Sequence, residues 1–151
     1  MSNEGRCSCG NVQFRLNAEP MMVHACHCTQ CQRLTGSAFV MNAVIEKDAV
    51  ELVSGEPRSA HFEGTSHTAY FCGDCGTYVW SHYAGMGGCW FIRVGTLAER
   101  DSLAPDVHIY TSTKQPWVVL PEGVPQFDEF YDLPTFWPPD KLARLKATQT
   151  G

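Results

Sequence analysis

The chain has 151 residues, of which 44% are hydrophobic and 18% are charged, and 11 Lys plus Arg against 16 Asp plus Glu give a formal net charge of -5. This length suffices for one domain with its own hydrophobic core, and the negative balance disfavours binding to nucleic-acid phosphates through clustered positive charge. The apolar runs are too short to cross a membrane, and residues 1–6 hold no signal-peptide stretch. We therefore expect a cytoplasmic protein whose thiols stay reduced.

Short predicted strands, separated by Gly and Pro, fill the first half of the chain. Val12, Phe14 and Leu16 alternate with polar neighbours, which indicates a half-buried strand. Further strands are expected near residues 21–25, 37–45, 48–53, 59–63 and 66–71. Residues 54–57 predict a turn, and residues 32–36 predict a loop or one helical turn.

The second half continues with strands and ends in an irregular arm. Strands are expected near residues 77–83, 89–94, 107–110 and 117–120, with a break at residues 85–88. Prolines recur from Pro121 onward, and the aromatic side chains expected to pack this arm are Phe127, Phe130, Tyr131, Phe136 and Trp137. Asp140 is predicted to cap a last helix over residues 141–147. Together these patterns predict a single all-β domain over residues 1–151, with a core of about 3–130 and a C-terminal arm of 131–151.

Eight cysteines stand in closely spaced groups, which are Cys7 and Cys9, then Cys26, Cys28 and Cys31, then Cys72 and Cys75, and last Cys89. Four disulfides are the first alternative, but a reducing compartment and a chain of this size disfavour them. The short spacings favour metal binding instead, because C-x-C and C-x-x-C turns bring sulfur atoms together around one ion.

Cys7, Cys9, Cys72 and Cys75 form the first predicted site. In both pairs the second cysteine is followed by a glycine, which adopts the positive φ that a tight turn around a metal often needs. Two such turns predict a closed, structural four-thiolate zinc site. The alternative is a redox pair at Cys72 and Cys75, but residues that favour strands follow it rather than a helix.

The triplet Cys26, Cys28 and Cys31 forms the second predicted site. Three protein ligands leave an open position, as in catalytic zinc sites. Such a position favours a soft ligand, and a metal ion there would lower the pKa of a substrate thiol. Cys89 remains open as a fourth ligand, although a lone cysteine beside Trp90 and Phe91 is more typical of a buried small hydrophobic residue.

Histidines near the triplet offer further alternatives. His27 could be a fourth ligand, although its place between two cysteines favours an orientation away from the ion. His24 could line a pocket or belong to the preceding strand. Sharing of the triplet with the first four cysteines in a polynuclear cluster is disfavoured in a chain with so much predicted β structure.

The cysteine motifs resemble a known family. Cys7-x-Cys9-Gly10, then Cys26-His27-Cys28-x-x-Cys31 with Gly36, then Phe71-Cys72-x-x-Cys75-Gly76 resemble the glutathione-dependent formaldehyde-activating enzymes, a family that includes relatives of centromere protein V. The resemblance covers about the first hundred residues. Trp117 and the Pro125-x-Phe127 pair are similar to later positions of that family.

The resemblance implies a zinc-ribbon-like β-tent fold with two zinc ions per chain. It implies structural ligands at Cys7, Cys9, Cys72 and Cys75 and catalytic-zinc ligands at Cys26, Cys28 and Cys31. The implied reaction is that of a carbon–sulfur lyase run toward synthesis, in which glutathione and formaldehyde give S-hydroxymethylglutathione. His27, His24 and Arg33 are candidates for substrate contact or proton transfer.

Two other classes of function compete with a lyase that acts on a small thiol such as glutathione. A non-catalytic zinc module could dock a partner on the aromatic arm, residues 127–137, although core packing explains the same residues. A nucleic-acid-binding zinc ribbon could use Lys141, Arg144 and Lys146, but the net charge disfavours it. A homodimer is expected only from the general prevalence of symmetric dimers.

Overall fold

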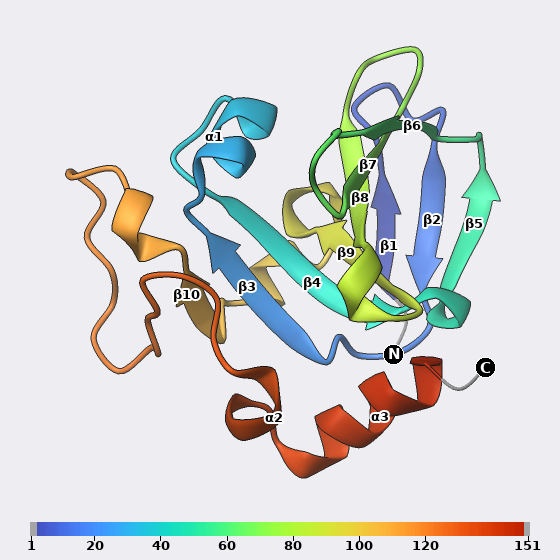
Figure 1. Cartoon of the computed structure of the whole chain (residues 1–151). Coiled ribbons are helices and arrows are strands. Elements are labelled where there is room, and N and C mark those ends of the chain that lie inside the picture. The colour runs from blue at the N-terminus through green and yellow to red at the C-terminus, as the bar shows by residue number, and fades with distance from the viewer. Residues whose placement is uncertain (1–2, 150–151) are drawn as a thin grey trace.

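The computed structural model describes residues 3–149, which form two β-sheets and three short α-helices (Figure 1). The strands are β1 (Asn3–Arg6), β2 (Gln13–Leu16), β3 (Met22–Cys26), β4 (Val40–Glu46), β5 (Val50–Ser54), β6 (Arg58–His61), β7 (His67–Phe71), β8 (Tyr78–Tyr83), β9 (Cys89–Arg93) and β10 (Val107–Ile109). The helices are α1 (Thr29–Thr35), α2 (Leu133–Phe136) and α3 (Pro139–Gln149). Within residues 3–149, none of the helices is long and apolar enough to cross a membrane.

The larger sheet has the strand order β10-β3-β4-β9-β8-β7-β6, and the smaller sheet has the order β1-β2-β5. Neighbouring strands are antiparallel except β10 and β3, which are parallel. In the centre of the larger sheet, Cys26 on β3 is opposite Val40 on β4, and Asn42 on β4 is opposite Arg93 on β9. This register brings three distant parts of the sequence to one face.

The two faces of the larger sheet are buried by different layers. On one face Ala43 and Ile45 of β4 pack with Phe14 of the smaller sheet. On the other face Val40 and Val44 pack with residues of the C-terminal arm, among them Tyr131, Trp137 and Leu145. The strand β4 is therefore buried on both sides, which explains its nearly continuous apolar sequence. Figure 1 shows α2 and α3 running below the long strands β3 and β4.

The predicted all-β, β-tent class is confirmed, and the C-terminal arm that was expected to be irregular contains the two helices α2 and α3. The expected packing of the arm is found for Tyr131 and Trp137, which are buried, whereas Phe130 is more exposed. The packing of Tyr131 and Trp137 agrees with the core-packing explanation of the aromatic arm.

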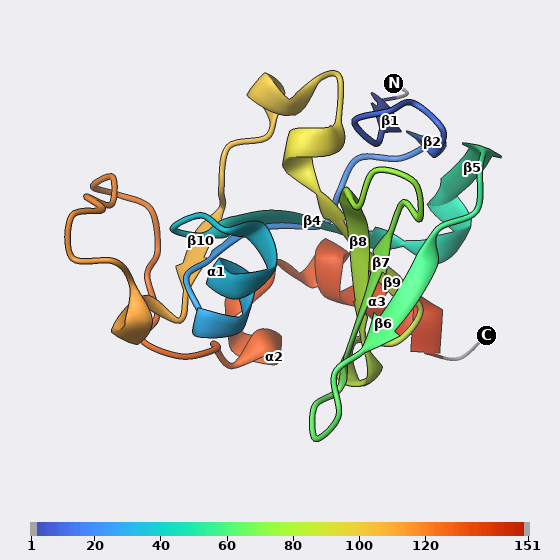
Figure 2. The same ribbon diagram turned by 90° about the horizontal axis from the view of Figure 1, so that it is seen from above.

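A strand over residues 117–120 was expected and is wrong. The segment is a turn in which Lys114 Nζ donates to the carbonyl oxygens of Gln115 and Val118. Pro116 cannot donate to a strand ladder, and Trp117 stays 73% exposed. Figure 2 shows this loop extending beyond β10 next to α1, and a hydrogen bond from Gln115 to Gln32 of α1 joins the two at 2.7 Å.

Three other local expectations are corrected. The loop or single turn predicted near residues 32–36 belongs to a longer helix, α1, which starts inside the cysteine motif. Asp140 does not cap the last helix, because α3 begins at Pro139 and the amide of Leu142 donates to the carbonyl of Pro138. Strand β1 was not predicted, and it pairs with β2 through a close approach at Gly5, where a Cβ atom would lie 2.3 Å from the ring of Phe14.

Candidate metal centres

The first group of cysteines joins the two sheets. The sulfur atoms of Cys7, Cys9, Cys72 and Cys75 all lie within 4.8 Å of one another. Cys7 follows β1 and Cys72 follows β7, so the group links segments that are 65 positions apart in the numbering. Four convergent thiols are the donor set that zinc takes in closed sites, and this group could hold such an ion.

Both turns of this group have the backbone geometry expected from their glycines. The amide of Gly10 donates to the carbonyl of Cys7 at 3.1 Å with φ +80°, and the amide of Gly76 donates to the carbonyl of Cys72 at 2.8 Å with φ +75°. The amide of Val12 also donates to the sulfur of Cys7 at 3.3 Å. Such amide donors disperse negative charge on the sulfur atoms, which suits thiolate ligands.

The second group is built where β3 runs into α1. Cys26 is the last residue of β3, Cys28 is the N-cap of α1, and Cys31 lies in the first turn of the helix. The sulfur of Cys28 accepts the amide proton of Cys31 at 3.3 Å, and the sulfur atoms of Cys26 and Cys31 are 3.6 Å apart. All three lie within 4.8 Å of one another and could also hold a metal ion. The C-x-x-C spacing is therefore one helical turn, with a sulfur as the capping acceptor.

Without a metal ion the triplet concentrates its negative charge on one sulfur. Hydrogen bonds from Cys26 and Cys31 lower the pKa of Cys28 to about 2. The hydrogen bond to Cys28 and burial raise the pKa of Cys26 far above its ordinary value. For Cys31, the bond with Cys26 lowers the pKa, but the bond with Cys28 and burial outweigh it and raise the pKa to about 12. Binding of a divalent cation would therefore displace protons from two thiols.

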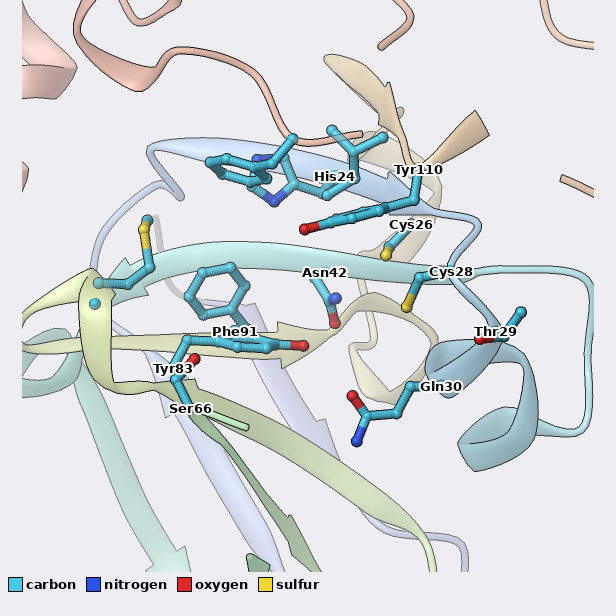
Figure 3. Close-up of a pocket in the computed structure, with 14 residues that line it drawn as sticks. His24, Cys26, Cys28, Thr29, Gln30, Asn42, Ser66, Tyr83, Phe91 and Tyr110 are labelled. Atoms are coloured by element: carbon cyan, nitrogen blue, oxygen red, sulfur yellow. The ribbon is translucent and has the colours of Figure 1, made fainter. Parts of the chain in front are cut away.

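A cavity of about 430 Å³ opens beside the triplet and receives Cys26 and Cys28 at one end (Figure 3). Its walls are largely aromatic and apolar, with Tyr83, Phe91, Tyr110 and Phe130 among them. Its polar lining consists of neutral side chains, namely His24, Thr29, Gln30, Asn42 and Ser66 with the two tyrosine hydroxyls. In the described part of the chain, no lysine, arginine or carboxylate lines this cavity. The sulfur atoms of Cys26 and Cys28 therefore face a neutral, mostly apolar space, in which electrostatic interactions are strong.

The two candidate histidines have different places. His24 lines the cavity, and its Nε2 lies 2.5 Å from the hydroxyl oxygen of Tyr131, which also accepts a hydrogen bond from Trp137. Burial lowers the pKa of His24 to about 3, so it is neutral. His27 is buried elsewhere, with its Nε2 3.0 Å from Nδ1 of His108, and does not belong to the triplet. Burial, followed by the charges of His108 and Lys114, lowers the pKa of His27 to about 4.

Cys89 and Arg33 both lie outside the triplet. Cys89 is fully buried at the start of β9, opposite Glu46, and it belongs to neither sulfur group within residues 3–149. Burial raises the pKa of its thiol to about 11, which fits a small hydrophobic residue. Arg33 is exposed on α1 and lines a second, more open hollow, which shares Thr29 with the first cavity.

Sequence reasoning missed a buried polar row behind the cavity. Asn42 on β4, Arg93 on β9, Ser81 on β8 and His67 on β7 are hydrogen-bonded to one another in that order. A signal was present, because Asn42 interrupts the apolar run of β4 and Arg93 directly follows the apolar run of β9. A buried polar residue in such a strand requires a partner, and this points to a network.

Comparisons with known proteins agree with the cysteine pattern. A family model described as "Glutathione-dependent formaldehyde-activating enzyme" matches residues 2–113. A provisionally named glutathione-dependent formaldehyde-activating enzyme of Penicillium rubens is 31% identical over 77 residues, which are 49% of this chain and 40% of that protein. The match thus spans less than half the length of this curated relative.

A similar fold is found among solved structures. The crystal structure of a Rhodobacter sphaeroides protein matches with a TM-score of 0.53 and 20% identity, covering 68% of this chain and 96% of the other. At this identity the likeness concerns the fold alone. The family match, by contrast, extends over most of the chain and confirms the predicted resemblance. This chain therefore belongs to the glutathione-dependent formaldehyde-activating enzyme family.

Proposed function

We propose that this protein is a zinc-dependent carbon–sulfur lyase-type enzyme that joins a thiol to a carbonyl compound, with glutathione and formaldehyde as the substrates to test first. In this scheme Cys26, Cys28 and Cys31 hold the catalytic ion, and Cys7, Cys9, Cys72 and Cys75 hold a structural one. The observation that carries the proposal is the difference between the two groups. The three-cysteine group borders the largely apolar cavity, whereas Cys7 of the four-cysteine group lines a separate hollow beside Arg6 and Arg100.

The chain's own residues support this chemistry in three ways. A zinc ion on the triplet would supply an open, Lewis-acidic position for a soft ligand such as a thiolate. The reacting groups would lie against largely aromatic and apolar walls, and burial keeps His24 neutral beside the hydroxyl of Tyr131. Burial raises the pKa of Tyr83 well above its ordinary value, so its hydroxyl stays protonated and can donate a hydrogen bond at the cavity wall.

The reaction itself balances without a further reagent. The sulfur of the thiol forms a bond to the carbonyl carbon, and the π electron pair of the carbonyl moves to its oxygen. That oxygen takes up the proton that the thiol releases, so the product is a hydroxymethyl thioether when the carbonyl compound is formaldehyde. The reverse direction cleaves the same carbon–sulfur bond.

Glutathione would need more room than the first cavity provides for its charged ends. Two carboxylates in a neutral apolar cavity would lose hydration without gaining a partner. The adjoining hollow contains Arg33, Gln32 and Ser37, and it meets the first cavity at Thr29. These two spaces favour an arrangement in which the thiol of glutathione lies in the cavity and one of its carboxylates lies near Arg33.

The first test is metal analysis of the purified protein and of three cysteine variants. We expect two zinc ions per chain in the wild type and one in Cys28→Ser. The matched control Cys89→Ser, a buried cysteine outside both groups, should keep both ions. A single ion in the wild type that is lost only in Cys72→Ser would overturn the open-site scheme.

The second test adds glutathione to cobalt-substituted protein. We expect the cobalt–thiolate absorption to change on addition of glutathione in the wild type and in Cys89→Ser, and not in Cys28→Ser. Formation of S-hydroxymethylglutathione from glutathione and formaldehyde should be accelerated in the same two proteins. If no thiol perturbs the cobalt spectrum and Cys28→Ser retains the activity, the lyase proposal is wrong.

A further inference from the structure

The polar row behind the cavity contains a buried cation. Asn42, Ser81, His67 and Arg93 are at most 5% exposed. Arg93 donates to Oδ1 of Asn42 through Nη1 and to Oγ of Ser81 through Nη2, the latter at 3.1 Å. Nε2 of His67 lies 2.7 Å from the same Ser81 oxygen. The row thus runs from β7 across β8 and β9 to Asn42, which is the member that reaches the cavity.

Arg93 has no carboxylate partner within the described residues. The ion pairs found there involve Arg15 and Arg144 only, and Nε of Arg93 is buried without an acceptor. A buried guanidinium without a counter-charge is costly, so a negative charge is expected nearby. On this face of the sheet the candidates are the thiolates of the triplet and a charge that forms on a bound substrate.

The bond from Arg93 fixes the orientation of the Asn42 amide. A guanidinium has only donors, so the atom of Asn42 that faces it must be the carbonyl oxygen. The amide nitrogen, which has two N–H donors, is then turned away from Arg93. Figure 3 shows the Asn42 side chain ending between the hydroxyl of Tyr83 and the sulfur of Cys28, and all three residues line the same cavity.

The sheet register places this donor close to the sulfur atoms. Cys26 is opposite Val40, and Asn42 is the next residue of β4 on the same face. An amide donor at this position faces the region in which a carbonyl carbon would meet a thiol sulfur. When the carbon–sulfur bond forms, the electron pair of the carbonyl moves to oxygen, and a pre-oriented donor stabilises that charge at no cost of reorganisation.

We propose that Asn42 is a catalytic residue whose Nδ2 donates a hydrogen bond to the substrate oxygen as its negative charge develops, and that Arg93 is a positioning residue that fixes the Asn42 amide and provides the balancing positive charge. The proposal rests on the function proposed above, because it concerns the oxygen of the same thiol adduct. A purely structural role is the competing explanation, in which Asn42 and Arg93 only satisfy each other in the core.

The deciding variant is Asn42→Asp. Aspartate has nearly the same shape and still accepts from Arg93, so the row and the fold keep their contacts, but it presents an acceptor to the cavity where asparagine presents a donor. We expect unchanged metal content, a cobalt titration by glutathione that is weakened but not abolished because the new carboxylate pairs with Arg93, and a 100- to 1,000-fold lower kcat for addition to formaldehyde. The control Asn17→Asp makes the same change at an exposed residue and should keep the wild-type kcat.

A spectroscopic measurement separates catalysis from structure. S-acetylglutathione is a suitable probe because its carbonyl carbon is bonded directly to sulfur. Its carbonyl oxygen therefore has the same position relative to sulfur as the oxygen of the hydroxymethyl adduct. A donor on that oxygen lowers its infrared carbonyl stretching frequency. We expect this lowering on binding to the wild type and its loss in Asn42→Asp. Arg93→Lys keeps the positive charge but lacks the planar guanidinium that bonds Asn42 and Ser81 together. It should therefore weaken the lowering of the carbonyl frequency and reduce kcat about tenfold.

These measurements distinguish a failure of the Asn42 role from a failure of the proposed function. If the wild type binds glutathione and catalyses the addition, and S-acetylglutathione competes with glutathione in the cobalt titration, but the carbonyl frequency of the bound probe does not fall, the role of Asn42 is wrong even if no variant folds. The same holds if Asn42→Asp keeps its kcat within threefold. If the wild type neither binds a thiol nor accelerates addition, the proposed function fails, and the role of Asn42 falls with it.

Discussion

Arg144 on α3 holds the carboxylate of Glu46 at the end of β4 through two hydrogen bonds of 2.7 Å, from Nε to Oε1 and from Nη2 to Oε2. The side chains are only 30% and 17% exposed, and Nη2 also donates to the carbonyl of Glu19 at 2.9 Å. Burial of Glu46 acts to raise its pKa, but the bonds from Arg144 outweigh burial and lower the pKa below its ordinary value. The pair therefore ties the C-terminal helix to the central strand.

Replacing Arg144 should loosen this helix. We expect Arg144→Met to lower the free energy of unfolding by about 1–2 kcal/mol at pH 7, because a bidentate, partly buried pair is stronger than an exposed one. Since the pKa of Glu46 is lowered in the folded state, its contribution is present above about pH 4.5 and is lost as the pH falls through the folded-state value. Urea unfolding with saturating zinc at pH 7 and pH 4 measures both effects.

The matched control for this prediction is Arg15→Met. Arg15 contacts two more exposed carboxylates, Glu4 and Glu51, through single contacts of 3.2 Å. Its loss should change the free energy of unfolding by less than about 0.5 kcal/mol. Equal effects of the two substitutions would contradict the special role of the Arg144 pair.

Patterns within short stretches of the sequence were sufficient to predict most elements of the fold. The alternation around Phe14 and the apolar run that ends at Ile45 became β2 and β4. The failed strand at residues 117–120 shows the limit, because apolar, β-prone residues form a strand only where a sheet edge is available, and there Lys114 closes the chain into a turn instead. The start of α1 was missed because a cysteine rather than Ser, Thr, Asp or Asn is its N-cap.

For the candidate site, the spacing of the cysteines predicted both sulfur groups, because each turn is a local motif and the two distant turns of the first group share the same Cys-Gly ending. The pair of Asn42 and Arg93 could not be predicted in the same way. These residues are 51 positions apart, and only the pairing of β4 with β9 brings them together. Strand register depends on the packing of whole faces and not on a local motif.

The two sulfur groups should affect stability differently. Cys72 is fully buried in the core around Phe14 and Trp80, whereas Cys28 is partly exposed at the cavity. We expect Cys72→Ser to lower the free energy of unfolding by more than about 4 kcal/mol, since it breaks the link between the two sheets. Cys28→Ser should cost less than about half as much. Thermal unfolding with zinc present would contradict the assignment if Cys28→Ser proved the more damaging change.

Acid should destabilise the fold through His67. Burial, and next the charge of Arg93, lower the pKa of His67 to about 4 from an ordinary 6.5. The unfolded state therefore binds more protons than the folded state between these values, so the contribution of neutral His67 is complete above about pH 6.5 and declines as the pH falls toward 4. One such group contributes at most about 1.4 kcal/mol per pH unit.

The variant His67→Gln tests this dependence, because its amide replaces the group near Ser81 Oγ but does not titrate. Unfolding free energies of wild type and variant, at equal metal content, should differ by an amount that shrinks as the pH falls from 6.5 to 4.5. A difference that stays constant over this range would show that His67 is not the titrating group.

Arg33 should determine how well the enzyme distinguishes glutathione from an uncharged thiol. Its guanidinium is exposed in the hollow that shares Thr29 with the thiolate cavity and does not line that cavity, so we expect it to contact a carboxylate of a bound thiol rather than the reacting atoms. An exposed ion pair contributes up to about 1 kcal/mol. We therefore expect Arg33→Gln to raise KM for glutathione about two- to fivefold with kcat unchanged, and to leave KM for 2-mercaptoethanol unaltered, with formaldehyde as the second substrate in both assays.

Lys146→Gln, which makes the same charge change at an exposed residue of α3, should alter neither KM. Equal increases for both thiols would mean that Arg33 shapes the hollow rather than binding a carboxylate, and an unchanged KM for glutathione would place its carboxylates elsewhere.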